Sequence, residues 1–103
     1  MAEYQLNRPS IDAIIDYCDG LDANDELEVF DFGKNNDLVL TIFKDEDYDA
    51  SKDKDAWNLV TITVKADGKY VEDTDDIYVT DGSLYRELKR IHDYDYEKEL
   101  EER

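Results

Sequence analysis

Four stretches rich in β-branched and aromatic residues are the feature that most restricts the fold of this chain. They cover residues 26–32, 37–44, 57–66 and 76–80, and Gly, Asn and Asp residues separate them. Within the second stretch, Leu38, Leu40 and Ile42 alternate with residues that point to the opposite side of an extended chain. Such alternation between turn-forming residues predicts strands. We therefore expect a sheet with one apolar face and one face that is only half polar.

Short connections indicate that neighbouring strands are antiparallel. The turn 33–36 joins the first two stretches as a hairpin, and Asp67-Gly68 forms a tight turn after the third. Residues 70–71 then begin a return strand, which the acidic run 72–76 interrupts. We expect the fourth strand to be short or bulged for that reason.

Helical spacing of apolar residues flanks these strands on both sides. Ile11, Ile14, Ile15 and Cys18 share one helical face, with Ser10 placed to cap the helix and Gly20 to end it. This pattern predicts a helix over 10–19. Leu84, Leu88 and Ile91 predict a second helix that reaches at least residue 93. Residues 94–103 are expected to form a frayed helical tail.

The predicted fold is of the α+β class. A three- to four-stranded antiparallel sheet packs against an N-terminal and a C-terminal helix, in the order α-β-β-β-(β)-α. The chain has 103 residues and no Pro/Gly/Ser-rich linker, so residues 1–103 are interpreted as a single domain. The half-apolar outer face, with Phe43, Trp57 and Leu59, suggests a partner contact or a homodimer.

The net charge of the chain is the sequence feature from which we infer its function. The chain has 29 Asp and Glu against 12 Lys and Arg, a formal charge of -17. A domain of this size is roughly 33 Å across, and that length of duplex DNA carries roughly 20 charges. Adaptation to high salt is disfavoured because eight of the 12 cations are Lys. The surface is expected to repel nucleic acid and attract proteins that bind it, and added salt should stabilise the fold.

Three acidic clusters, interleaved with tyrosines, supply the predicted binding surface: a long loop at 45–55, the run 72–76, and the tail that begins at 93. Carboxylates could take the place of phosphates, and tyrosine rings are common at interface hot spots. A solvated surface with no binding role is the alternative interpretation of such runs. The predicted partner-binding residues are Asp45, Glu46, Asp47, Tyr48, Asp49, Asp53, Asp55, Glu72, Asp73, Asp75, Asp76, Asp93, Tyr94, Asp95, Tyr96 and Glu97.

The residues disfavour catalysis, a metal site and a cofactor. His92 is the single histidine, and Cys18 lies on the apolar stripe of the first predicted helix. A calcium-binding loop starting at Asp45 would need Gly at position 50 and a carboxylate at 56, where the chain has Ala50 and Ala56. We therefore predict that the protein is not an enzyme and binds no metal or cofactor. With one cysteine and neither an apolar leader nor a membrane-spanning stretch, a cytoplasmic protein is expected.

Size, acidity and element order resemble those of phage-encoded DNA mimics, above all the small acidic anti-CRISPR and anti-restriction proteins. The resemblance covers the whole chain but rests on no alignable motif. It implies an inhibitor that acts in the bacterial host cell and blocks the nucleic-acid-binding surface of a Cas effector, restriction enzyme or nuclease. The alternative is an immunity protein or antitoxin that covers the cationic active site of a nuclease toxin. A structural or adaptor domain, made acidic only for solubility, is the third interpretation.

Overall fold

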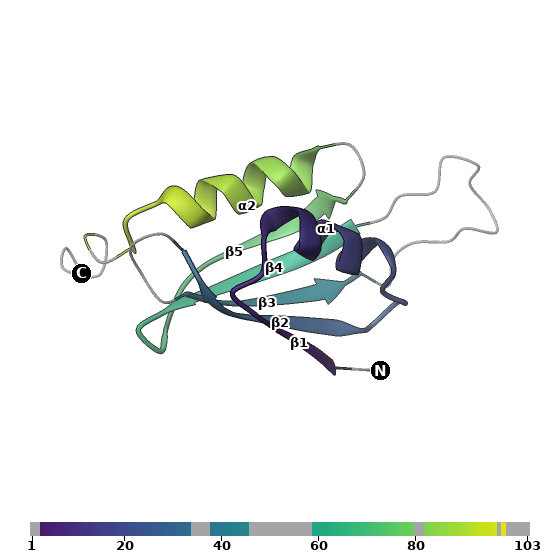
Figure 1. Ribbon diagram of the computed structural model, residues 1–103, viewed down its shortest axis with the longest axis horizontal. Helices are drawn as coiled ribbons and strands as arrows, with labels where there is room; N and C mark the ends of the chain where they lie inside the picture. The colour runs from purple at the N-terminus through teal and green to yellow at the C-terminus, as the bar shows by residue number, and fades with distance from the viewer. Residues whose placement is uncertain (1–2, 34–37, 46–58, 80–81, 97, 99–103) are drawn as a thin grey trace.

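The residues that the structure describes form a five-stranded mixed sheet with two helices on one side (Figure 1). The computed structural model describes residues 3–33, 38–45, 59–79, 82–96 and 98. The elements are β1 (Glu3–Asn7), α1 (Ile11–Asp19), β2 (Glu26–Phe32), β3 (Leu38–Lys44), β4 (Leu59–Ala66), β5 (Lys69–Tyr78) and α2 (Ser83–Asp93). Strands lie in the sheet in chain order, so β1 and β5 are its edges.

The predicted helix-first order is wrong because strand β1 precedes α1. β1 pairs in parallel with β2, from Glu3 opposite Glu26 to Asn7 opposite Phe30. A parallel pair cannot be closed by a hairpin, and α1 provides the crossover that it requires. The alternation of Tyr4 and Leu6 with polar residues is too short to stand out in the sequence, and Pro9 ends it. The sheet is therefore mixed, with the remaining strand pairs antiparallel.

The fourth strand was expected to be short or bulged, and the structure shows that it is bulged but not short. β5 runs from Lys69 to Tyr78 without a break, through the acidic residues that were expected to interrupt it. An edge strand tolerates this run because its outer side faces water, and charge there disfavours pairing with other chains. Two shifts in its register with β4 accommodate the irregularity, and Asp76 adopts a left-handed conformation (φ 56°) beside one of them.

Both helices follow the sequence prediction closely. α1 begins after Ser10, whose hydroxyl oxygen accepts a hydrogen bond from the Ala13 N–H at 3.1 Å. α2 ends at Asp93, and its apolar stripe of Leu84, Leu88 and Ile91 is fully buried. Neither of the two helices that the described residues form is long and apolar enough to cross a membrane.

One apolar core lies between the sheet and the helices. Ile14 and Cys18 from α1 and the apolar stripe of α2 pack against alternate residues of β2, β3 and β4. The sheet contributes Leu27, Val29, Leu38, Leu40, Ile42, Val60, Ile62 and Val64. The intervening residues lie on the opposite face, which we call the outer sheet face. The described residues place no helix over that face (Figure 1).

Candidate partner-binding surface

The longest stretch without a cation coincides with α1 and β2. Residues 9–33 contain no Lys or Arg. Their acids are Asp12, Asp16, Asp19, Asp22, Asp25, Glu26, Glu28 and Asp31. Sequence reasoning missed this segment because apolar residues separate the acids, so no acidic run is visible. The signal that could have revealed it is the absence of positive charge over the whole segment.

On α1, the acids share one exposed face. Asp12, Asp16 and Asp19 recur at intervals of four and three residues, opposite the buried side chains of Ile14 and Cys18. The amphipathic pattern that buries one side of the helix therefore also places the carboxylates together on the other. Asp12 in the first turn interacts favourably with the helix dipole, whereas Asp16 stands four residues from it with the same charge.

The loop between α1 and β2 is held against the end of β3. The Asp25 carboxylate is buried and accepts the Asp22 N–H at 3.1 Å, while the Lys44 N–H donates to the Asp25 carbonyl at 3.0 Å. The Lys44 side chain lies beneath this loop with 8% of its surface exposed. Burial lowers the pKa of Lys44, and the nearby Asp19, Asp22 and Asp45 oppose that shift. This lysine offers little positive surface to a partner.

Acids between β5 and α2 differ from those of α1, because the predicted residue Glu72 and the unpredicted residue Glu87 both bind groups within the protein. Arg90 Nη2 donates to Glu72 Oε1 at 2.8 Å, and the guanidinium also binds Glu87. Thr74 Oγ1 donates to the same Glu87 carboxylate at 3.2 Å. The hydrogen bonds to Glu87 and the contact with Glu72 raise the pKa of Arg90. Glu72 and Glu87 therefore tie β5 to α2.

Tyr96 belongs to this network and not to an exposed contact surface. The side chain is fully buried, and its hydroxyl donates to Glu72 Oε1. Burial first, and then the bond to Glu72, raise the pKa of the Tyr96 phenol. Tyr94, by contrast, is 45% exposed and packs its ring against that of Tyr96 with centroids 4.6 Å apart. Of these two predicted contact tyrosines, only Tyr94 offers its ring to a partner.

The remaining predicted residues are dispersed. Asp73, Asp75 and Asp76 are exposed on β5. Asp45 directly follows β3, and its carboxylate accepts a hydrogen bond from Thr61 Oγ1 at 3.0 Å. At the end of α2, Asp93 contacts Lys89 at 3.3 Å, and Asp95 accepts the Lys98 N–H. The predicted residues Glu46, Asp47, Tyr48, Asp49, Asp53, Asp55 and Glu97, and also Trp57, lie outside the described residues.

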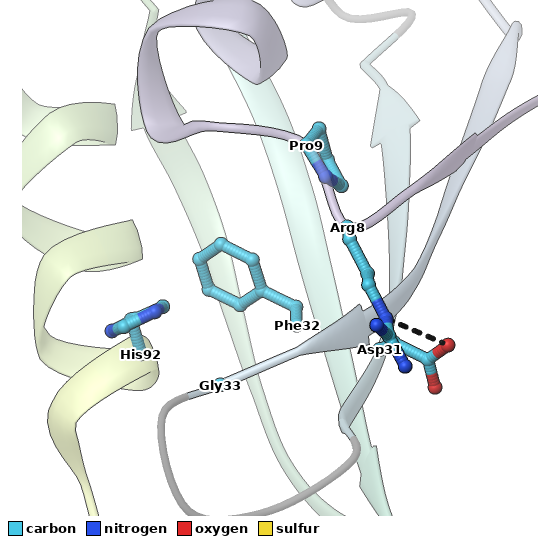
Figure 2. A pocket seen from close by; sticks show the side chains of 6 residues that line it. All are labelled: Arg8, Pro9, Asp31, Phe32, Gly33 and His92. Carbon is cyan, nitrogen blue, oxygen red and sulfur yellow. Dashed lines mark ion pairs between the residues drawn. The ribbon is translucent and has the colours of Figure 1, made fainter.

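A shallow depression of about 310 Å³ lies where β1 and β2 end, next to the end of α2 (Figure 2). Arg8 and Asp31 face one another across its rim, with Arg8 Nε 3.6 Å from Asp31 Oδ2. Both residues adopt left-handed backbone conformations, with φ of 51° and 54°. His92 stacks edge-on against Phe32 and bonds Asp93 through Nδ1 at 2.9 Å. The polar groups of the depression therefore pair with each other or with a neighbour, which leaves few for a ligand.

The part of the chain that the structure describes shows neither a grouped set of metal ligands nor a reactive thiol. No three His, Cys, Asp or Glu side chains there are grouped to hold a metal ion. The Cys18 thiol is buried, and burial raises its pKa to about 12, so the nucleophilic thiolate is strongly disfavoured. No family model matches this chain, and neither a curated protein nor a solved structure matches it. The fold and the charge distribution thus define a small α+β protein with a polyanionic N-terminal half.

Proposed function

We propose that the protein is an acidic inhibitor that imitates DNA and occupies the nucleic-acid-binding surface of a bacterial defence effector. The observation that supports this proposal best is the cation-free segment 9–33. Four of its acids, Asp12, Asp16, Asp19 and Asp22, are exposed on α1 and the following loop, and Glu26 and Glu28 are partly exposed on the opposite side of the molecule, on the outer sheet face. A surface of this kind favours arginine and lysine side chains that otherwise hold phosphates.

The mechanism would be competitive and electrostatic. Long-range attraction would raise the rate of encounter between the acidic surface and the cationic groove of the effector. Carboxylates would then pair with the cations and exclude the nucleic acid from the groove. Because the attraction is screened within about 10 Å at 0.1 M salt, binding should weaken steeply as salt rises.

A pull-down from bacterial lysate at low and high salt tests the proposal, with the captured proteins identified by mass spectrometry. We expect a DNA- or RNA-binding effector that is retained at low salt, released at high salt and inhibited in its own assay. Capture of a nuclease toxin would instead identify an immunity protein. Failure to enrich any nucleic-acid-binding protein at low salt would contradict the proposal.

Two variants of equal charge make the pull-down specific for the acidic segment. The first changes Asp12, Asp16 and Asp19 to Asn on α1, and we expect it to lose most of the captured effector. The control changes Glu3 to Gln and Asp67 and Asp95 to Asn, three exposed acids outside the segment and at separate places on the surface. Asn suits the left-handed backbone at Asp67, so the control should fold. Equal losses in both variants would mean that overall charge, and not this surface, determines binding.

A further inference from the structure

On the outer sheet face, carboxylates on β2 and β5 flank threonine and apolar side chains on β3 and β4. We call the two rows of carboxylates the margins of this face and the area between them its floor. One row of the register crosses all five strands, from Gln5 through Glu28, Thr41 and Thr63 to Asp73. The adjacent row places Glu26 beside Phe43 and Thr61. Carboxylates therefore stand on β2 and β5, and the floor between them lies on β3 and β4.

The floor does not belong to the protein core. Phe30, Val39, Phe43 and Leu59 are partly exposed, and none of them packs against the buried cluster beneath the helices. Both helices lie on the other side of the sheet (Figure 1). Partly exposed aromatic and β-branched side chains on one continuous face are typical of a surface that a partner covers.

The spacing of the margins fits one helix. Neighbouring strands lie about 4.8 Å apart, so Glu28 on β2 and Asp73 on β5 are separated by three strand spacings, roughly 14 Å. An α-helix with its side chains is about 10–12 Å in diameter. The major groove of DNA, which also accepts an α-helix between two negatively charged margins, is about 12 Å wide.

We propose that the outer sheet face docks a cationic α-helix of the partner protein along β3 and β4, in place of the major groove. This inference rests on the proposed function and adds a second contact to it: the acidic side of α1 would bind the groove of the effector, and the outer sheet face, on the opposite side of the sheet, would bind one of its helices. Arginine and lysine stems would cover Thr41, Thr63 and Phe43, and their charged ends would reach Glu26 and Glu28 on one margin and Asp73 on the other. Lys65, opposite Val39 and Tyr70, would exclude cations from the end of the face near the β4–β5 turn.

A defined peptide tests the docking face without the natural partner. The probe is a synthetic helical peptide with an alanine and leucine stripe flanked on both sides by arginine, titrated into ¹⁵N-labelled protein. The control peptide has the same composition with the stripe scrambled. We expect the stripe peptide to shift the amide signals of Thr41, Phe43 and Thr63, and the scrambled peptide to bind more weakly. Shifts centred on Asp12 and Asp16 of α1 would overturn the proposal.

Two charge reversals of equal size locate the binding independently. Glu28→Lys lies on the margin of the face, and Asp16→Lys lies on the exposed side of α1; each changes the net charge by the same amount. We expect Glu28→Lys to weaken peptide binding about tenfold and Asp16→Lys less than about threefold. Equal weakening would overturn the proposal, because it would show only long-range attraction. Asp73→Lys on the opposite margin, an exposed edge residue, repeats the test if Glu28→Lys fails to fold.

The same pair of variants separates this inference from the proposed function. If the captured effector is lost with Asp16→Lys but retained with Glu28→Lys, the acidic inhibitor stands and the docking face is wrong. If the wild-type protein captures no nucleic-acid-binding protein, the proposed function is wrong. The peptide titration then decides alone whether the face accepts a cationic helix.

Discussion

The N-terminal unit β1–α1–β2 and the C-terminal unit β5–α2 are both rich in acids, but they use them differently. In the first unit, Asp12, Asp16 and Asp19 face solvent, and the segment 9–33 holds no cation. In the second, Glu72 and Glu87 bind Arg90 and connect a strand to a helix. The difference shows that the density of acids along a chain does not tell which of them a partner can reach. The positions of the Lys and Arg residues that bind the acids show which of them remain accessible.

The largest expected effect is the loss of the Tyr96 side chain from the C-terminal unit. Tyr96→Ala removes a fully buried ring, so the free energy of unfolding should fall by about 3 kcal/mol. Tyr94→Ala is the control, since that ring is 45% exposed, and it should cost less than about 1 kcal/mol. Urea denaturation measures both. Similar values for the two variants would show that Tyr96 is not part of the core.

Glu72→Gln tests whether the acids of β5 are internal ties. The neutral amide weakens the contacts with Arg90 and Tyr96, and we expect a loss of about 1–2 kcal/mol in the free energy of unfolding. Asp73→Asn, one residue away on the exposed side of the strand, should change it by less than about 0.5 kcal/mol. Equal small effects would indicate that the network contributes nothing to stability.

Alkaline pH should destabilise both units, in two different ranges. The pKa of Cys18 is raised from 9.0 to about 12, so its contribution is complete below pH 9 and is lost as pH rises towards 12. The pKa of Tyr96 is raised from 10.0, so its contribution is complete below pH 10 and is lost above it. Melting temperatures from pH 8 to 11 should fall from about pH 9. Cys18→Ala should remove the earlier part of the fall, and Tyr96→Phe the later part; an unchanged profile would contradict these assignments.

The smallest effect, and one of opposite sign, is expected on α1. Asp16→Asn relieves the repulsion from Asp12 four residues earlier, so it should stabilise the protein by about 0.3 kcal/mol. The gain should shrink in 0.5 M NaCl, where the charges are screened. Melting temperatures at two salt concentrations measure it. Destabilisation at low salt would show that Asp16 makes a contact that holds the helix.

Periodic patterns predicted both helices and strands β2, β3 and β4, but the predicted helix-first, antiparallel fold was wrong, because the patterns failed where sequence periodicity is short or is interrupted by charge. The apolar spacing from Ile11 to Cys18 and from Leu84 to Ile91 placed both helices, because a buried face imposes that spacing. β1 was missed because a five-residue edge strand buries too little to leave a clear pattern. β5 was predicted to break because acidic residues are rare inside sheets, whereas an edge strand can carry them.

The candidate surface was less predictable than the fold. Asp73, Asp75 and Asp76 are exposed as expected, but Glu72 in the same run faces α2, because adjacent residues of a strand point to opposite faces. The acids of α1 were missed because the helix gathers residues that are separated along the chain. Grouping the charged residues by the helical period, as was done for the apolar residues, would have shown that these acids share one face of the helix.

Exclusion of DNA from the partner is the most direct test of imitation. The captured effector, a labelled duplex that it binds, and this protein are mixed and separated by size-exclusion chromatography. We predict that the effector elutes either with DNA or with this protein, and that the fraction bound to DNA falls as this protein is added. A stable complex that contains all three would contradict the proposal that the acidic surface occupies the place of a nucleic acid.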